Sequence, residues 1–434
     1  MKHLFTLLTL ICVLALNAQS LGYNDLGVLF TNEQDNGTAR FRAMSGAFGA
    51  LGGDLSAIEI NPAGTAVFLK SEFGISMNIR NQSINSNYYG TNTTIEDDYT
   101  NLSQIGTVFV FKNNISDWSN MGIGFNYSLS NDFDDFWIAQ GNSDYATFIY
   151  NEDMDEDNLY LNTDGQYYEN YTSGQTNKYT FTFASQYKDK LYLGASFTSH
   201  DIRHYQSVYL VEDNYNDLGE PLPIYLSNLN EELSTFGYGF SFGLGIIVKP
   251  TDNVRLGLAY RSPVWYNLTE EFFDNNGFLN GFRYDMRAPS KYTGSFAYIF
   301  GKNGLISVDY TYRNYSNIKL EPSNEFQPEN QFFSNNLQGT SEVRAGAEWR
   351  VKRLSLRGGY NYKQNPYKDA ISSDNLTGFS VGAGYNFGFA KFDFAYENTQ
   401  RTDVYDFYPQ YDEVDAAELD FDTSKWTLSL VFNL

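Results

Sequence analysis

Residues 179–187 read YTFTFASQY, and large aromatic side chains stand at alternate positions of this stretch. One set contains Tyr179, Phe181, Phe183 and Tyr187, and the other contains Thr180, Thr182, Ala184 and Gln186. Alternation with a period of two predicts a β-strand, because successive side chains of a strand point to opposite faces. One face of this strand is therefore aromatic and the other is small and polar.

The same alternation recurs from residue 72 to the end of the chain. It is found in GLISVDYTYR (304–313), VRAGAEWR (343–350), LSLRGGYNY (354–362), KFDFAYEN (391–398) and KWTLSLVFNL (425–434). A soluble sheet turns its apolar face inward, whereas a membrane barrel turns that face outward to lipid. Aromatic residues make up 17% of the chain, and the chain ends on an amphipathic strand with aromatic side chains. Both observations favour the membrane barrel.

The number of alternating segments also fits a barrel. They begin near residues 72, 103, 119, 177, 191, 235, 254, 289, 304, 339, 353, 377, 391 and 422. Single-chain bacterial barrels have an even number of strands. We therefore predict an all-β fold, a transmembrane antiparallel β-barrel of about 14 strands. Short connections such as 188–190 should face the periplasm and long polar ones the outside; the longest is expected at about residues 131–176.

The first eighteen residues, MKHLFTLLTLICVLALNA, are typical of a cleaved signal peptide. Lys2 and His3 precede an apolar run that is too short to span a bilayer comfortably, and Ala18 is a small residue suited to cleavage. The only cysteine, Cys12, lies in that run, so the mature chain is predicted to lack disulfides. Together with the barrel pattern, export predicts the outer membrane of a Gram-negative bacterium.

The net charge is strongly negative. It is −23 for the whole chain, and removing residues 1–18 leaves 28 basic against 52 acidic residues, or −24. Nucleic acid is therefore excluded as a partner, because phosphate binding needs a basic face. We expect outer-membrane lipid and lipopolysaccharide around the barrel, and the barrel-assembly machinery during insertion.

Residues 19–70 precede the first strand and do not alternate. The stretch SAIEINPAGTAVF (56–68) is small-sided, and its Asn61-Pro62-Ala63-Gly64 motif predicts a turn. Helix-compatible pieces lie at 41–51 and 55–60. A barrel of this size encloses room for an internal segment, so we predict a compact plug, or hatch, at 19–70 and a barrel at 71–434.

The stretch GYGFSFGLG (237–245) has one face of large residues and one that is almost bare. Its bare face contains Gly237, Gly239, Ser241, Gly243 and Gly245. Two interpretations remain open at this stage: something packs closely against the bare face, or the glycines permit barrel curvature.

Five stretches, in order, resemble the FadL/TodX-type family of outer-membrane transporters. They are RFRAMSGAFGALGGDLSAIEINPAGTAVF (40–68), LGLAYRSPVWYNLTEEF (256–272), MRAPSKYTGSFAYIF (286–300), VDYTYRNYSNIKL (308–320) and EVRAGAEWR (342–350). The first is similar to the family's hatch signature and aligns Asn61, Pro62 and Ala63 with its Asn-Pro-Ala motif. The resemblance covers essentially the whole mature chain.

The resemblance implies passive uptake of a hydrophobic small-molecule ligand, a long-chain fatty acid or an aromatic hydrocarbon, through a fourteen-stranded barrel closed by a hatch. It also implies that the ligand leaves sideways at a kink in the wall, and that no cofactor or metal drives the movement. The protein is not expected to be an enzyme.

Candidate ligand-contacting residues come from two sources. Arginine suits a carboxylate because its fork donates two parallel hydrogen bonds, and alternation turns four arginines to the lumen: Arg255, Arg344, Arg350 and Arg357. The alternative is that these charges pair with others across the lumen. The stretch LGYNDLGVLF (21–30) is a candidate for reaching into the lumen; its apolar residues are Leu21, Leu26, Leu29 and Phe30. The alternative is an ordinary mobile terminus.

Two patterns resemble metal sites without matching them. His200 and His204 are four residues apart, which on a strand is about 13 Å and too far to share one ion. The acidic stretch NEDMDEDNLYLNTD (151–164) imitates the spacing of a calcium loop, but Asn158 stands where the turn glycine belongs. We interpret it as an acidic surface loop, with calcium as the alternative.

Two other functions stay open. A general porin for polar solutes would need a wet lumen, against which the small-sided block at 40–68 argues. A structural or surface-binding barrel would act through its long acidic loops.

Overall fold

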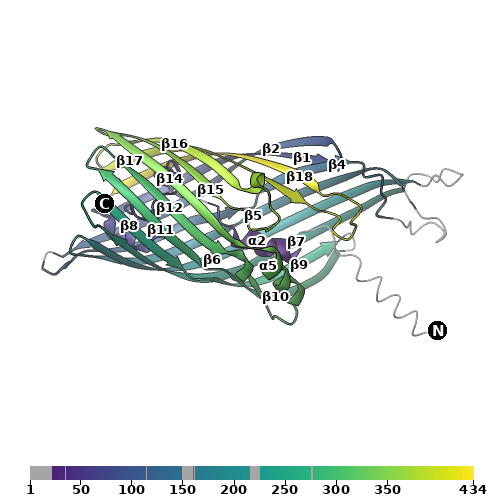
Figure 1. Ribbon diagram of the computed structural model, residues 1–434, viewed down its shortest axis with the longest axis horizontal. Helices are drawn as coiled ribbons and strands as arrows, with labels where there is room; N and C mark the ends of the chain where they lie inside the picture. The colour runs from purple at the N-terminus through teal and green to yellow at the C-terminus, as the bar shows by residue number, and fades with distance from the viewer. Residues whose placement is uncertain are drawn as a thin grey trace.

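The computed structural model describes residues 22–34, 36–113, 115–148, 160, 162–215, 225–274 and 277–434. Their strands form one closed antiparallel sheet (Figure 1), in which the first strand pairs with the last from Glu72 opposite Asn433 to Asn87 opposite Glu418. No helix among these residues is long and apolar enough to cross a membrane.

Within the described residues, the sheet contains 18 segments, and four strands are each interrupted into two segments, which gives the predicted fourteen. The interrupted strands are β3/β4, β8/β9, β10/β11 and β12/β13. The segments are β1 (Glu72–Tyr88), β2 (Thr91–Lys112), β3 (Trp118–Asp132), β4 (Asp135–Gly141), β5 (Asn162–Tyr187), β6 (Leu191–Tyr215), β7 (Tyr225–Val248), β8 (Val254–Arg261), β9 (Val264–Asp274), β10 (Gly277–Ala288), β11 (Lys291–Phe300), β12 (Gly304–Asn314), β13 (Lys319–Glu321), β14 (Gly339–Val351), β15 (Leu354–Lys363), β16 (Leu376–Asn386), β17 (Ala390–Tyr405) and β18 (Ala417–Asn433).

The barrel wall is apolar outside and polar inside. On β5, Phe181 is 53% exposed on the outer face, whereas Thr180 and Thr182 are buried on the inner face. On β18, Trp426 and Leu428 face outward and Thr427 faces inward. The faces predicted from alternation are therefore confirmed for these strands.

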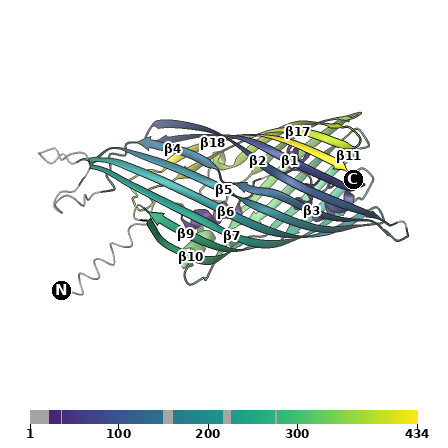
Figure 2. The same ribbon diagram turned by 180° about the vertical axis from the view of Figure 1, so that it is seen from behind.

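Several strands are longer than predicted. The prediction of one long loop at about residues 131–176 is wrong, because strand residues occupy much of that range. β2 begins at Thr91 rather than near 103, and β5 begins at Asn162 rather than near 177. β7 begins at Tyr225 rather than near 235, and the strand β10/β11 begins at Gly277 rather than near 289. The additional residues lie beyond the lipid-facing band, where outward side chains such as Asn92 and Glu96 are polar and no apolar alternation marks the strand. Figure 2 shows β5, β6 and β7 projecting past the rest of the barrel.

The two ends of the barrel differ in their connections. The C-terminus lies at the end that carries short turns, among them 188–190, 301–303, 352–353 and 387–389. This end faces the periplasm in outer-membrane barrels. The opposite end carries longer connections, including the helix α5 (Gln327–Asn336) and the 3₁₀ turn η3 (Ser372–Asp374), whereas the 3₁₀ turn η2 (Tyr315–Asn317) lies at the interruption between β12 and β13.

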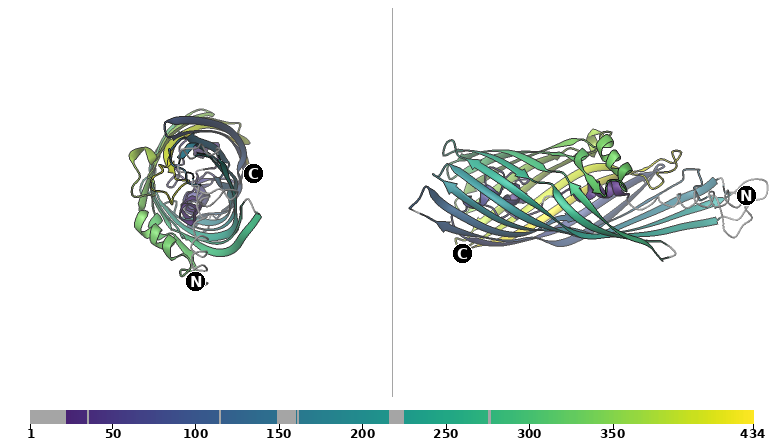
Figure 3. Two further views of the ribbon diagram at one scale, coloured as in Figure 1. Left: turned by 90° about the vertical axis from the view of Figure 1, so that its right-hand side faces the viewer. Right: turned by 90° about the horizontal axis from the view of Figure 1, so that it is seen from below.

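The N-terminal segment lies inside the barrel, as the end-on view in Figure 3 shows. It contains α2 (Tyr23–Thr31), α3 (Ala39–Arg42), α4 (Ala57–Ile60) and the 3₁₀ helix η1 (Pro62–Val67). The helix expected over 41–51 is wrong, because Gly46 and Gly52 adopt positive φ angles and the chain turns repeatedly after Arg42. We refer to residues 36–70 as the hatch segment.

Side chains of the wall hold the backbone of the hatch segment. Asp309 on β12 accepts hydrogen bonds from the backbone nitrogens of Phe48 and Gly49, at 3.0 and 2.9 Å. Asn120 on β3 donates to the carbonyl oxygens of Ala66 and Phe68. These bonds pair buried backbone groups of a segment that lies outside the sheet.

Candidate functional site

An apolar chamber surrounds α2 in the lumen. Leu26 and Phe30 are almost fully buried there. A Cβ atom on Gly27 would lie 2.6 Å from the ring of Phe333, so α2 and α5 are in direct contact. The chamber is formed by Phe133, Ile202, Leu233, Val264, Tyr266, Leu268, Tyr284, Met286, Ala288, Tyr315, Ile318, Leu320, Phe326, Phe333 and Leu337. The helix therefore lies in the largest cluster of buried hydrophobic residues among the described residues.

The chamber contains one buried carboxylate with hydroxyl partners. Tyr23 of α2 donates a hydrogen bond to Glu270 of β9 at 2.7 Å, and Tyr284 of β10 lies 3.4 Å from the other carboxylate oxygen. An apolar site with a few convergent polar groups is the usual form of a small-molecule site.

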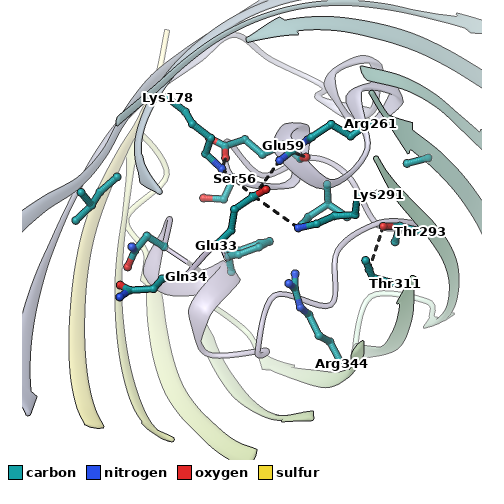
Figure 4. Close-up of a pocket in the computed structure, with 15 residues that line it drawn as sticks. Glu33, Gln34, Ser56, Glu59, Lys178, Arg261, Lys291, Thr293, Thr311 and Arg344 are labelled. Carbon is teal, nitrogen blue, oxygen red and sulfur yellow. Dashed lines mark hydrogen bonds and ion pairs between the residues drawn. The ribbon is translucent and has the colours of Figure 1, made fainter. Parts of the chain in front are cut away.

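A cluster of basic side chains lies directly after α2, around Glu33 (Figure 4). Arg313 of β12 and Arg261 of β8 contact its two carboxylate oxygens at 2.7 and 3.0 Å. Lys291 of β11 and Lys178 of β5 lie at 3.5 and 3.6 Å. We call these four residues the basic cage. It brings together cations from four strands.

The basic cage also binds the hatch segment and the end of α2. Lys178 forms a second ion pair with Glu59 at 2.6 Å. Arg261 donates to the carbonyl oxygen of Glu59, and Arg313 donates to that of Thr31, the last residue of α2. The cage thus contacts the helix, Glu33 and the hatch segment at once.

The basic cage keeps Glu33 ionised. Burial alone would raise the pKa of its carboxyl group, but Lys291, Arg261, Arg313 and Lys178 outweigh burial and hold that pKa well below its ordinary value. Glu33 is therefore a carboxylate over the whole physiological pH range.

A cavity of about 260 Å³ adjoins the chamber and Glu33, and most of the residues that line it are polar or charged. Leu29 and Glu33 line it from the N-terminal segment, and Asp132 and Phe133 line it from the wall. Phe133 lies at the interruption between β3 and β4, and its ring contacts that of Phe30. The cavity thus connects the chamber with the interrupted strand.

The hydrogen-bond ladder of the wall ends beside that interruption. β3 pairs with β2 only as far as Ser128 opposite Gln104. Beyond that point, β2 pairs with β1 on one side, and no described strand pairs with it on the other. β4 instead bends inward: Ser86, on the inner face of β1, donates to the carbonyl oxygen of Ile138, and Arg80 contacts Asp135 at 3.1 Å. We call this unpaired stretch of the wall, between β2 and β3/β4, the wall gap.

The comparisons with known proteins agree with this architecture. A family model described as "Outer membrane protein transport protein (OMPP1/FadL/TodX)" matches residues 27–430. The chain belongs to this family. Its members are outer-membrane transporters of hydrophobic compounds, which gives the protein its location and its general function as a transport channel rather than an enzyme. A search of curated proteins finds no match.

Solved structures of FadL/TodX proteins share the fold at low sequence identity. A FadL homologue of Pseudomonas aeruginosa superposes with a TM-score of 0.61 at 16% identity, over 92% of this chain and 99% of that one. The toluene transporter TodX of P. putida gives a TM-score of 0.54 at 15% identity, over 92% and 98%. The toluene transporter TbuX of Ralstonia pickettii gives 0.50 at 15%, over 90% and 98%.

The Asn-Pro-Ala-Gly motif of this FadL/TodX chain packs against the periplasmic end of the wall. Asn61 donates to the carbonyl oxygens of Gly49 (2.8 Å) and Ile246 (3.1 Å), and its own side-chain oxygen accepts from Ala63. Pro62 begins η1, and Gly64 lies against Gly52. The motif therefore joins two turns of the hatch segment to β7.

Glycines in the wall make room for this contact. A Cβ atom on Gly194 of β6 would lie 2.4 Å from the backbone of Pro62 and Ala63, and one on Gly245 would lie 1.9 Å from Asn61. Close packing is thus confirmed at Gly245. At Gly237, Gly239 and Gly243 the nearest atoms belong to neighbouring strands.

All four predicted arginines are located in the wall, and three pair with carboxylates. Arg344 bonds to Glu342; Arg350 and Arg357 both bond to Glu348 at 2.6 Å, and Arg357 also reaches Asp393. Arg255 donates to the carbonyl oxygen of Leu51 at 2.6 Å. Arg344 also lines the space beside the cage (Figure 4). Ligand contact by any of them stays a prediction.

The N-terminal candidates lie in the lumen where the structure describes them. Leu26 and Phe30 are in the apolar chamber and Leu29 lines the cavity. Leu21 lies outside the described residues, as does the predicted signal peptide. Most of the acidic loop at 151–164 also lies outside them.

Both histidines are buried on β6. His200 shares a hydrogen bond of 3.0 Å with Ser241, and His204 lies between the rings of Phe30 and Phe133. Among the described residues, no group of three metal-ligating side chains is close enough to hold an ion.

The sequence analysis missed the basic cage. Arg313 belongs to the lumen-facing set of its strand, but Glu33 lies in a segment without periodicity, and Lys178 and Lys291 lie at the ends of apolar alternation. Continuing the alternation past the apolar band would have turned all four cations inward, but would not have shown that they converge.

Proposed function

We propose that this FadL/TodX protein takes up hydrophobic small molecules passively, long-chain fatty acids or aromatic hydrocarbons being the two leading classes. The observation that supports this most directly is the apolar chamber beside the wall gap. A water-filled pore for polar solutes does not need fifteen apolar or aromatic wall and loop residues around one buried helix. The names of two relatives, both toluene transporters, support the aromatic class.

The proposed route begins at the outer end and does not cross the hatch segment. A ligand enters beside α5, takes the apolar volume that α2 fills, and passes along the cavity to Phe133. It leaves through the wall gap into the outer leaflet. The chamber holds the apolar ligand, and movement of the ligand down its concentration gradient needs no energy source.

A disulfide across the wall gap tests the route. Asn101 of β2 donates to Asp132 of β3 at 2.7 Å, so these two side chains meet across the gap, and loss of free thiols in the double cysteine variant verifies that its two cysteines have paired. Cys12 is the only natural cysteine and lies in the predicted signal peptide, so no other thiol competes. Uptake of radiolabelled oleate and toluene is measured in cells that express the double variant, with and without reductant.

We expect the oxidised double variant to lose uptake and the reductant to restore it, while Asn101→Cys and Asp132→Cys alone stay active. Equal uptake in the oxidised and reduced states would exclude the wall gap as the exit. Failure of the unaltered protein to take up either compound would refute the proposed function itself.

A further inference from the structure

A groove of about 620 Å³ lies on the outer, lipid-facing side of the wall. It crosses β6, β7, β8, β11 and β12, which are neighbours in the sheet (Figure 1). Its lining is apolar and aromatic, and two of its members, Leu258 and Tyr292, are 67% and 51% exposed. We call it the outer groove, and it is separate from the chamber and the cavity of the lumen.

Gly294 of β11 forms the floor of the outer groove. It lies opposite Leu258 of β8 on one side and Tyr310 of β12 on the other. A Cβ atom on Gly294 would meet only a side-chain carbon of Leu258, at 4.0 Å. The hydroxyl group of Tyr310 shares a hydrogen bond of 2.9 Å with that of Ser341 on β14, so its ring is held toward β14. The depression thus results from one absent side chain and one ring that is fixed to the side.

Two rows of outward-facing side chains cross the strands at the outer end of the groove. The first row, on β8, β11 and β12, is aromatic and consists of Tyr260, Tyr292 and Tyr312. The second row, on β9, β10 and β13, is nearer the outer end of the barrel and consists of Trp265, Arg287 and Lys319. Met286 and Ala288 are buried, so Arg287 between them points outward. The outer surface therefore changes from apolar to basic over one short step.

This step marks the height of the head groups. Tyrosine and tryptophan gather at the two edges of the hydrocarbon layer in membrane proteins. Arg287 and Lys319 lie just beyond that aromatic edge, on the side of the outer leaflet. We call these two residues the basic pair.

The basic pair is available to an anion. Arg287 and Lys319 are directly opposite on neighbouring antiparallel strands, so their Cα atoms are about 5 Å apart. Lys319 pairs with Glu321 at 2.5 Å, but among the described residues no carboxylate lies within 4.0 Å of Arg287. Two neighbouring cations with one close carboxylate leave a positive charge, on a chain that has 52 acidic and only 29 basic residues.

We propose that the outer groove and the basic pair form a binding site for lipid A, the phosphorylated and acylated anchor of lipopolysaccharide. One acyl chain lies in the groove above Gly294, and a phosphate lies between Arg287 and Lys319. The planar fork of arginine and the ammonium group of lysine both suit a phosphate.

The head group supplies the selectivity of this site. An acyl chain is in an apolar environment both in the groove and in the bilayer, so the groove adds packing but no hydrophobic gain. The charge contact adds the preference for a phosphorylated lipid. The site lies outside the barrel, so the inference does not depend on which compound the lumen transports.

The test titrates the full-length protein in detergent with bis-phosphorylated lipid A and with the same lipid A after its phosphates have been removed. Native mass spectrometry reports the fraction of protein with bound lipid. Arg287→Gln/Lys319→Gln removes the charges of the basic pair. Arg203→Gln is the matched control, because Arg203 of β6 is 77% exposed and lies 3.9 Å from Asp201.

A second pair of variants tests the groove. Gly294→Leu fills its floor. Gly358→Leu is the control, because Gly358 lies on the outer face of β15 between the exposed Leu356 and Tyr360, and an added carbon would meet only the carbonyl oxygen of Ser380, at 3.7 Å. Heat-modifiable migration verifies that each variant has folded.

We expect the unaltered protein to bind phosphorylated lipid A about tenfold or more tightly than the phosphate-free form, the factor that one charge-assisted hydrogen bond is worth. The double variant should lose this preference and Arg203→Gln should keep it. Gly294→Leu should weaken the binding of both forms, and Gly358→Leu that of neither.

Equal affinity of the unaltered protein for the two forms, or an equal loss of preference in Arg203→Gln, would overturn the inference. Phosphatidylglycerol is the competing lipid. If it binds as tightly as lipid A and is lost in the same variants, the site belongs to phospholipid and the assignment to lipid A is wrong.

Discussion

Replacing Gly194 by alanine should open the barrel. Gly194 lies on the inner face of β6, and its added Cβ would lie 2.4 Å from the nitrogen of Ala63 and 2.4 Å from the carbonyl carbon of Pro62. These are backbone atoms of the hatch segment, so no side-chain rotation relieves the contact. Either the strand or the hatch segment must move, and the strand is held by hydrogen bonds on both sides.

The size of the effect follows from the cost of overpacking. An extra carbon in a well-packed interior costs about 1–3 kcal/mol. If this cost falls on the closed state alone, the ratio of closed to open protein drops by about 5- to 150-fold. The contact around Asn61 and Pro62 has little free space, so the added carbon displaces this part of the hatch segment.

Single-channel conductance in planar bilayers measures the result. The matched control is Gly294→Ala on β11, where the added carbon faces lipid and its nearest neighbour is a side-chain carbon of Leu258 at 4.0 Å. We expect frequent openings in Gly194→Ala and none beyond the unaltered level in Gly294→Ala. Equal conductance of the two variants, with both barrels folded as judged by heat-modifiable migration, would refute the view that contact with β6 keeps the lumen closed.

Three further outcomes are expected. Deletion of residues 19–66 should give steady conductance where the full chain is closed; steady conductance by the full chain would instead favour a porin. Because the pKa of Glu33 is lowered, its ion pairs stabilise the docked segment fully above the ordinary pKa of 4.5 and are lost only as the pH falls through the lowered value. Hydrogen exchange of α2 should therefore stay slow at about pH 5 and accelerate only at more acidic pH; acceleration between about pH 6 and 5 would contradict the assignment. Phe333→Ala removes the ring against Gly27, costs about 3–5 kcal/mol, and should speed exchange in α2 far more than Phe332→Ala, whose ring is half-buried; equal effects would contradict the packing described.

The sequence predicted the lipid-exposed wall because there one physical requirement acts on every second residue. Outward side chains such as Phe181 and Trp426 must be apolar, which fixes both the faces and the number of strands. Beyond the lipid band the requirement disappears, so the extensions of β2 and β5 carry no signal. The small side chains of the hatch segment also predicted close packing, because glycine and alanine are needed where backbones approach closely, as at Gly64.

The candidate site was predictable only in part. Phe30 and Leu26 stood out as apolar residues in an otherwise unassigned terminus, but α2 lacks a strong cap and its burial depends on strands far away in the chain. The basic cage depends on the register of β5, β8, β11 and β12 relative to one another. Hairpin registers follow from the side-chain pattern and the turns, but the position of β5 relative to β11 and β12 depends on closure of the whole sheet, which no local pattern encodes.

The height of the wall gap determines how a molecule that leaves by the proposed route meets the membrane. On β2 the outward-facing side chains include the apolar Phe111, Phe109, Ile105 and Leu102, and they are polar at the exposed positions from Thr100 to Asn92. The unpaired edge thus begins where the hydrocarbon ends, so its backbone groups meet head groups and water rather than acyl chains. An amphiphile that leaves here can tip its tail into the leaflet while its charged end remains hydrated. Its charged group does not cross the hydrocarbon layer, and the molecule enters the leaflet in the same orientation as a membrane lipid.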